Sequence, residues 1–252
     1  MRTESDKQRT EDVIAGRNAV AEALKSGRAI DSVLVARGNR TGSIGVLIAK
    51  CRDAGIPVKD ADPRKLETMA GPNHQGIVAI AACKEYATVD DLFALAAERG
   101  EEPLFVVCDE LEDPHNLGAI LRTAEAAGAH GVIVPKRRSA GLTSTVYKAS
   151  AGAVEYVPVA RVTNIADTLR DLKARGVWVY GLDMDGQSYD KTDLRGAAAL
   201  VVGAEGNGIG RLVRSECDVV VSLPMRGKIQ SLNASVACGI LLYEAARQRS
   251  TP

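Results

Sequence analysis

Three polar clusters in the C-terminal half of the chain contain residue types that could bind a ligand or take part in group transfer. They span residues 109–124, 203–210 and 222–237. Each follows a short apolar run typical of a buried strand and leads toward a helical pattern. Where a strand gives way to a helix, unpaired amides and the positive end of the helix dipole can hold a ligand. The three clusters are therefore the candidate functional segments.

The third cluster is the one around which the chain is organised. It predicts the end of a strand, a tight loop with Pro224 and Gly227, and a helix over 231–248. Ser231 suits the N-cap, because its hydroxyl oxygen can accept from the first free amides. The residues at helical spacing behind it are predicted to face a core: Leu232, Val236, Gly239, Ile240 and Tyr243. Spacing alone fits an ordinary capped terminal helix better than a binding site.

The other basic and glycine-rich features also have two interpretations. Arg122 alone is better explained by a surface pair with Glu125, three positions on. The glycines of 203–210 permit close approach to the backbone but do not match the dinucleotide fingerprint G-x-G-x-x-G, which disfavours a nicotinamide-dependent dehydrogenase. Lys136, Arg137 and Arg138 directly follow a predicted strand and could hold phosphates, or could form a solvated basic loop.

Composition limits the class of protein. The 252 residues carry 32 basic and 32 acidic side chains, and 46% hydrophobic content is enough for one large or two small cores. Residues 1–83 hold 13 basic and 10 acidic residues, a weak sign of a module that faces nucleic acid. Five scattered cysteines indicate reduced core thiols in a cytoplasmic protein. We expect no metal site, because the three histidines lack ligand spacing, and no membrane segment or signal peptide.

The chain divides into four segments by composition and periodicity. Residues 1–11 are predicted to be a disordered lead, 12–83 a small α/β module, 84–102 a linker with one amphipathic helix, and 103–252 a larger domain. In the small module, helices are expected at 17–25 and 44–54 and strands at 32–36, 57–59 and 76–82. Its loops carry several Arg and Lys side chains, for which RNA contact and simple solubility are equally good explanations.

The larger domain alternates strands with helices, which predicts a mostly parallel sheet covered on both faces. Strands are expected at 104–108, 131–135, 154–158, 177–182, 198–203 and 219–223, and helices at 117–127, 144–149, 165–174, 209–214 and 231–248. Ligands of such sheets bind outside the carboxyl ends of the strands, where all three polar clusters are placed.

Taken together, the three clusters are specific where each alone is not. The segments "DPHNLGAILRTA", "VVGAEGNGIG" and "LPMRGKIQSLNASVA", in this order, resemble the three signature motifs of the SpoU class of RNA ribose 2′-O-methyltransferases, in the SPOUT superfamily. The resemblance covers residues 104–249. The N-terminal module, with "IAGRNAVAEAL" and "HQGIVA", is similar to a ribosomal-protein-like substrate-binding domain, and "GVIVPKRRSA" and "VPVARVTNIA" resemble the RlmB-like branch, which methylates a guanosine of large-subunit ribosomal RNA.

The resemblance implies a fold, a cofactor and partners. The fold is α/β with a C-terminal trefoil knot, the cofactor is S-adenosylmethionine, and the partners are ribosomal RNA and a second copy of the chain. The implied catalytic positions are Asn116, Arg122, Glu205, Ser231 and Asn233. The implied methyl-donor positions are Gly203, Leu223, Met225, Leu232 and Ala234. The expected RNA-binding residues are Arg17, Arg37, Arg40, Lys136, Arg137 and Arg138.

Other functions remain open at this point. Within the same class, the substrate could be a transfer RNA or another ribosomal nucleotide, because the N-terminal module would select it. From a different class, a non-catalytic RNA-binding or ribosome-assembly factor could share the fold. The complete set of motif residues argues against that second alternative.

Overall fold

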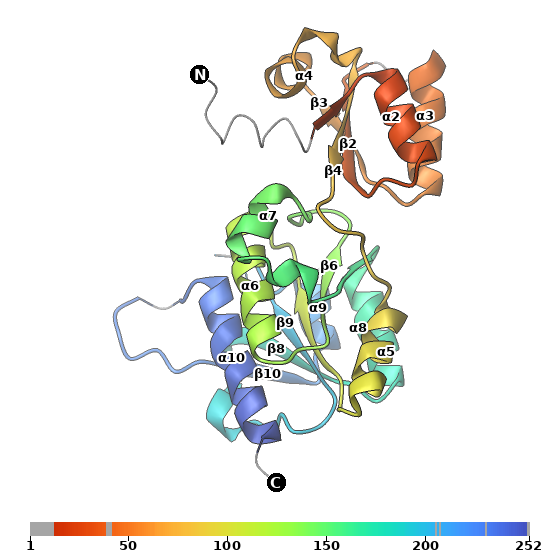
Figure 1. Ribbon diagram of the computed structural model, residues 1–252. Coiled ribbons are helices and arrows are strands. Elements are labelled where there is room, and N and C mark those ends of the chain that lie inside the picture. Colours follow the sequence, from red (N-terminus) through yellow and green to blue (C-terminus); the bar gives the residue numbers. More distant parts are fainter. Residues whose placement is uncertain (1–12, 39–41, 205, 207, 230, 251–252) are drawn as a thin grey trace. The chain divides into compact units, whose positions relative to one another are not determined.

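The structure is a computed structural model that describes residues 13–38, 42–204, 206, 208–229 and 231–250 (Figure 1). Contacts divide the chain into two compact units, one of residues up to 85 together with 141–145, the other of residues 86–140 and 146–252. The lead predicted over 1–11 lies outside the described residues. The expected amphipathic helix is α5 (Val89–Arg99), and it packs into the core of the second unit.

The first unit is a four-stranded sheet with helices on both faces. Its elements are β1 (Val13–Ala15), α2 (Arg17–Lys25), β2 (Ile30–Ala36), α3 (Gly42–Asp53), β3 (Val58–Ala61), α4 (Pro63–Ala70), η1 (Pro72–His74) and β4 (Ile77–Ala81). The strand order is β1-β4-β2-β3, and β4 is antiparallel to both neighbours. The sequence analysis missed α4, although Asp62 caps it by accepting from the Arg64 amide and Pro63 occupies its first position.

The second unit is a six-stranded sheet between two layers of helices. Besides α5, its elements are β5 (Leu104–Cys108), α6 (Pro114–Ala126), β6 (Gly131–Pro135), α7 (Ser144–Ala149), η2 (Ala153–Glu155), β7 (Val159–Val162), α8 (Ile165–Ala174), β8 (Trp178–Ser188), η3 (Tyr189–Lys191), β9 (Ala198–Val202), α9 (Arg211–Glu216), β10 (Val219–Ser222) and α10 (Ala234–Arg249). The order β10-β8-β9-β5-β6-β7 is parallel throughout, as predicted.

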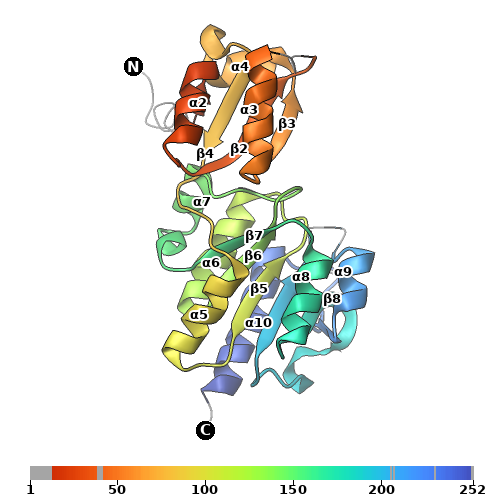
Figure 2. The ribbon, with the colours of Figure 1, turned by 90° about the vertical axis from the view of Figure 1, so that its right-hand side faces the viewer.

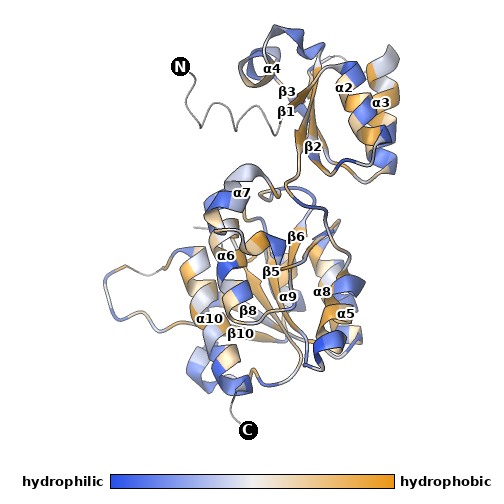
Figure 3. Cartoon of the chain, in the orientation of Figure 1, coloured by the Kyte–Doolittle hydropathy of each residue, from blue (hydrophilic) through white to orange (hydrophobic). Residues whose placement is uncertain are grey.

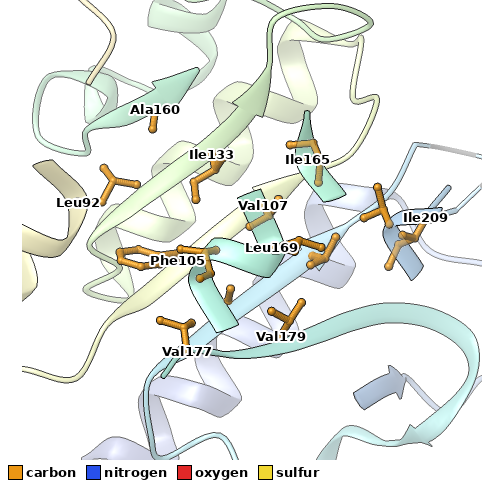
Figure 4. Close-up of a cluster of buried hydrophobic side chains, with 14 residues drawn as sticks. Leu92, Phe105, Val107, Ile133, Ala160, Ile165, Leu169, Val177, Val179 and Ile209 are labelled. Atoms are coloured by element: carbon orange, nitrogen blue, oxygen red, sulfur yellow. The ribbon is translucent and has the colours of Figure 1, made fainter. Parts of the chain in front are cut away.

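Helices α6 and α10 cover one face of this sheet, and α5, α8 and α9 cover the other (Figures 1 and 2). On the second face, Phe105 and Val107 of the central strand belong to one buried cluster with Leu92 of α5, Leu169 of α8 and Ile209, which precedes α9 (Figure 4). The strands are apolar along most of their length (Figure 3), as expected of a sheet buried on both sides. All five cysteines are free thiols, and burial raises the pKa of Cys108 to about 12, so that this thiol stays neutral.

One predicted strand is wrong. Residues 154–158 were expected to form it, but Ala153–Glu155 form a 3-10 turn that follows Gly152 in the left-handed region, and the strand begins only at Val159. Val154 and Val157 are buried while Tyr156 is exposed, so the apolar residues fit the turn three apart rather than the two-residue period of a strand. The trefoil knot implied by the family resemblance stays a prediction.

The outward face of α10 was also predicted wrongly. Val236, Ile240 and Tyr243 were expected in a core, yet they are 51%, 37% and 55% exposed. The buried face is instead the one formed by Ala234, Cys238, Leu241, Leu242 and Ala245, which packs toward α6 and β9. Both sets of residues have helical spacing, because this helix is apolar almost all round. Periodicity therefore could not decide which face meets the sheet.

A buried histidine at the amino edge of the sheet gives a first prediction. His130 is 1% exposed; its Nδ1 accepts from the Leu104 amide at 3.0 Å, and its Nε2 lies 2.9 Å from a Glu101 oxygen. Since Nδ1 accepts, the proton is on Nε2 and the ring is neutral. Burial lowers the pKa of His130, and the hydrogen bond to Glu101 only partly opposes this.

Because the folded-state pKa lies below the unfolded value of about 6.5, the unfolded chain takes up this proton first as the pH falls. The stabilising contribution should be complete above pH ~6.5 and be lost progressively below it. Urea unfolding between pH 7.5 and 5 measures the slope, and His130→Asn, which keeps an acceptor near Nδ1 but does not titrate, should show a shallower one. An unchanged slope in that variant would contradict the assignment.

Candidate active site

The three polar clusters meet at the carboxyl edge of the six-stranded sheet. The strand order places β10, β8, β9 and β5 side by side, so the segments that follow β5, β9 and β10 lie at one edge. A direct contact joins the first and third clusters, because Nδ2 of Asn233 donates to Oδ1 of Asn116 at 2.8 Å across 117 positions of sequence. The sequence analysis expected this convergence, and the structure shows it.

Asn233, rather than Ser231, is the N-cap of α10. Its Oδ1 accepts from the Ser235 and Val236 amides at 3.0 and 3.3 Å and from the Ser235 hydroxyl at 2.6 Å. These bonds fix the orientation of the side-chain amide and direct Nδ2 toward Asn116, which is only 5% exposed. The helix therefore begins three residues later than predicted. The cap of α10 is part of the candidate site itself.

Asn233→Asp separates these two roles. Aspartate keeps the oxygen that caps α10 but removes the Nδ2 donor, so the buried Asn116 oxygen loses this hydrogen bond and meets a carboxylate. We expect about 1–3 kcal/mol lower free energy of unfolding in urea. The matched control is Asn164→Asp at the cap of α8, where Asn164 accepts from the Asp167 amide, and it should change stability by less than ~0.5 kcal/mol. Equal losses in the two variants would show that the Asn116 contact contributes nothing.

The glycine-rich second cluster forms a compact loop at the end of β9. Ala204 and Gly208 exchange backbone hydrogen bonds at 3.1 and 3.0 Å, and Gly206 and Gly208 have φ of 84° and 63°. A Cβ on Gly203 would lie 2.1 Å from the carbonyl carbon of Gly208, so only glycine fits there. Glu205 lies outside the described residues.

Asp109, Asp183 and Asp185 make contacts that the sequence did not predict. Asp109, just after β5 and 6% exposed, accepts from the Gly210 amide at 2.8 Å, and burial raises the pKa of its carboxyl. In β8 the register with β10 shifts between Val220 and Val221, which leaves residues 182–186 unpaired with β10, although Leu182 still pairs with Val202 of β9. Arg214 of α9 binds Asp183 and Asp185 of that segment. Since β8 lies between β10 and β9, this segment stands between the second and third clusters. No motif pointed to it.

Arg122 is the predicted catalytic residue that does not join the asparagine contact. It is exposed on α6 and makes no hydrogen bond or ion pair with any residue that the structure describes, Glu125 included. Arg122 is six residues after Asn116 and therefore lies about 240° further around the helix. It is four residues after Gly118, so Arg122 and Gly118 are on the same face of α6. Arg122 is therefore available to a substrate on that face, and the surface pair with Glu125 does not form.

The remaining predicted positions lie in the loop from β10 to α10. Leu223 and Met225 are half-buried, Ser231 and Leu232 are exposed, and Ala234 is 8% exposed at the first position of the helix. The backbone amides of Met225 and Leu232 donate to no residue that the structure describes. Amides without a described acceptor, on the segment that follows β10, suit a planar heterocycle with donors and acceptors along one edge, as in the adenine of S-adenosylmethionine.

The expected RNA-binding residues differ in what they contact. The Arg17 guanidinium donates to the Gln75 carbonyl and the Ser43 hydroxyl at 3.3 and 3.0 Å, so it is engaged within the first unit. Arg138 pairs with Glu110 at 2.6 Å. Lys136 is half-buried, Arg37 and Arg137 are exposed, and Arg40 lies outside the described residues.

Comparison with known proteins assigns the family. Residues 103–243 match the model of the SpoU rRNA Methylase family, and residues 13–87 match that of the RNA 2′-O ribose methyltransferase substrate-binding domain. The chain belongs to the SpoU rRNA methylase family. Within it, the chain is 49% identical over 240 residues to Bacillus subtilis YacO, assigned to the TrmH family of tRNA/rRNA methyltransferases, with 95% of this chain and 96% of YacO covered.

Two solved structures share the fold. An AdoMet-bound rRNA methyltransferase from Sinorhizobium meliloti is 28% identical with a TM-score of 0.59, over 93% of this chain and 86% of its own. The A. aeolicus TrmH/SpoU tRNA modifying enzyme is 31% identical with a TM-score of 0.55, over 59% of this chain and 76% of its own. Like the rest of the SpoU family, this protein is an S-adenosylmethionine-dependent RNA ribose 2′-O-methyltransferase with an N-terminal substrate-binding domain.

The described residues were also compared with the requirements of a metal site and of a membrane-spanning helix. Within the described residues, no group of three or more His, Cys, Asp or Glu side chains is placed to hold a metal ion. No helix in the same part of the chain is long and apolar enough to cross a bilayer.

Proposed function

We propose that this protein methylates the ribose 2′-hydroxyl of a guanosine in large-subunit ribosomal RNA, as the RlmB-like branch does. The choice of ribosomal RNA over transfer RNA rests on how much of this chain each solved structure covers. The rRNA enzyme from S. meliloti covers 93% of this chain and so extends into both units, whereas the tRNA enzyme from A. aeolicus covers 59%, which is less than the length of the larger unit. Because the N-terminal unit would select the RNA, sharing that unit favours ribosomal RNA and a cytoplasmic site of action.

The chemistry assigned to the chain's own residues is binding and charge stabilisation. When bound, S-adenosylmethionine would supply an electrophilic methyl group; its transfer to the 2′-oxygen breaks the methyl–sulfur bond, leaves a neutral thioether and needs no metal. We assign its binding to the backbone of the glycine loop and of residues 223–234. The Asn116–Asn233 contact holds the two site segments together. The Arg122 guanidinium stabilises the developing alkoxide or the adjacent phosphate, and the proton of the 2′-hydroxyl passes to phosphate or water.

We also propose a homodimer formed through the outer face of α10. Val236, Ile240 and Tyr243 leave an apolar stripe on a helix that otherwise packs onto the sheet. Leu232, 41% exposed, extends the stripe to the loop that carries the methyl-donor positions. Apolar residues at this spacing fit the matching face of a second copy, since a C2 interface is self-complementary.

Ile240→Glu tests this interface. A charge at the centre of the stripe should convert the dimer to a monomer in sedimentation equilibrium at micromolar concentration, because burying it unpaired in the interface is unfavourable. Unfolding in urea should change little for the separated chain, since Ile240 is on the surface of the monomer. Leu212→Glu on α9, where Leu212 is 58% exposed, is the matched control and should remain dimeric. A monomeric wild-type protein would refute the proposal.

Mapping of 2′-O-methyl groups in cellular RNA, with and without the gene, tests the substrate. We expect one guanosine of the large-subunit RNA to lose its methyl group in the deletion strain and to regain it on complementation. Loss at a transfer RNA position instead would support the alternative substrate. Unchanged RNA together with no heat of S-adenosylmethionine binding in calorimetry would indicate a non-catalytic factor.

A further inference from the structure

Two exposed tyrosines stand within one short stretch of the second unit. Tyr147 of α7 is 41% exposed and Tyr156, just after η2, is 74% exposed. Residues 146–156 also include Lys148, which is exposed between them in sequence. We call this stretch the tyrosine segment. Tyrosine is enriched at contact surfaces because its ring is apolar and its hydroxyl is polar, so two exposed tyrosines within ten residues make the segment a candidate contact surface.

The tyrosine segment is held rigidly by its own backbone. The Ser150 side chain is buried; its hydroxyl donates to the Tyr147 carbonyl at 2.9 Å and accepts from the Val154 amide at 3.4 Å. Ala151 with φ of 51° and Gly152 in the left-handed region turn the chain between the two tyrosines. Both rings are therefore carried on a fixed turn, so little backbone entropy would be lost when a partner binds.

The same segment packs against α6, the helix that carries Arg122. A Cβ on Gly118 would lie 2.4 Å from the Cβ of Ala149, so the two backbones are in direct contact. Arg122 is four residues after Gly118 and lies on the same face of α6. The contact with Ala149 and the Arg122 side chain therefore lie on one face of α6, one helical turn apart, with Arg122 further along the helix from the carboxyl edge of the sheet.

Charge around the tyrosine segment favours a polyanion. Residues 136–157 contain four basic side chains and a single acidic one, Glu155, in a chain whose formal net charge is zero. Lys136 and Arg137 directly follow β6, at the same edge of the sheet as the N-terminus of α6. Exposed Lys148 follows Tyr147 directly, and a cation next to exposed aromatic rings is a combination that binds single-stranded nucleic acid, because the rings stack on bases and the cation contacts phosphates.

We propose that Tyr147 and Tyr156 form a stacking platform for unstacked bases of the RNA strand that carries the target ribose. The platform takes single-stranded RNA and leads it along α6 to Arg122. It requires only that RNA is the substrate, which the family establishes, and not the choice of ribosomal RNA or of guanosine.

Tyr147→Ala and Tyr156→Ala test the platform, with a fluorescein-labelled 20-nucleotide poly(A) strand and a 20-base-pair RNA duplex as probes. Fluorescence anisotropy should show the single-strand Kd raised about 5- to 150-fold by each alanine, while Phe at either position stays within about threefold of wild type. Duplex affinity should not change. The slope of log Kd against log salt should not change in the tyrosine variants. In Lys148→Ala the slope should become shallower by the amount that corresponds to about one phosphate contact.

Trp178→Ala is the matched control, since Trp178 is 57% exposed at the first residue of β8, on the opposite edge of the sheet. It should bind both probes as wild type does. Calorimetry with S-adenosylmethionine checks that every variant is folded. Wild-type affinity for the single strand in both alanine variants would overturn the platform. The same conclusion would follow if the alanine variants became monomeric while their RNA affinity stayed unchanged. Failure of ribosomal RNA methylation alone would contradict the proposed substrate and leave these binding results intact.

Discussion

Arg122→Ala is expected to lower methyl transfer about 100- to 1000-fold while S-adenosylmethionine binds with unchanged affinity. Arg122 is exposed on α6 and makes no hydrogen bond or ion pair with a described residue, so its removal leaves no buried group unpaired and the fold is kept. Removing one preorganised donor that stabilises a developing oxyanion has an effect of this size. Single-turnover transfer of a labelled methyl group to purified large-subunit RNA measures the rate, and calorimetry measures the methyl-donor affinity.

Arg122→Lys separates the roles that the guanidinium could have. Lysine keeps the charge but not the planar fork of donors, so a strong loss would show that two-pronged contact to alkoxide and phosphate matters. Near-normal turnover would show that a simple cation suffices, and would exclude both the guanidinium acting as base and a bidentate contact. Glu125→Ala, three residues along the same helix and also exposed, is the matched control and should retain wild-type rates.

The arrangement of the catalytic unit could be predicted because its signals are strong. Six apolar runs separated by helical patterns predict a parallel sheet, and the rule that ligands bind at the carboxyl edge places the three polar clusters together. The bond between Asn116 and Asn233 shows that this reasoning was sufficient to find the contact of two clusters 117 residues apart.

The parts that sequence reasoning missed depend on tertiary packing. Nothing local distinguishes Val236, Ile240 and Tyr243 from the buried face of α10, because both faces are apolar and the sheet decides between them. Asp109 was visible as a charged residue after a strand, but its bond to Gly210 spans 101 positions. Arg214 binds two aspartates of a segment that leaves the β8 ladder, and a register shift of this kind has no reliable sequence signature.

The cap of α10 shows a finer limit. Ser231 and Asn233 both precede the same apolar helix, and both are good N-cap residues. The choice falls on Asn233 because its side chain carries the capping oxygen and the Nδ2 donor on separate atoms, so it caps α10 and also reaches Asn116. A serine would have to accept and donate through one oxygen on a shorter side chain. A long-range partner, and not local propensity, therefore decides where this helix begins.

Gly203→Ala should abolish methyl-donor binding while leaving a folded protein. A Cβ at this position would meet the carbonyl carbon and oxygen of Gly208 at 2.1 Å and the Ile209 amide at 2.4 Å, so backbone rather than a flexible side chain must move. The paired bonds between Ala204 and Gly208 would open, and the loop would lose the shape that holds the donor. We expect S-adenosylmethionine affinity to fall at least ~100-fold in calorimetry, with methyl transfer lost in parallel.

Gly196→Ala is the matched control for this variant. A Cβ at Gly196 would meet nothing within 4 Å, so the substitution tests the effect of an added methyl group away from the site. It should bind S-adenosylmethionine as wild type does, with a change in unfolding free energy below ~1 kcal/mol. Far-ultraviolet circular dichroism separates loss of the loop from loss of the fold. Tight donor binding by a folded Gly203→Ala protein would mean that the glycine loop is not part of the methyl-donor site, and the assignment of Leu223, Met225 and Leu232 beside it would then lose its main support.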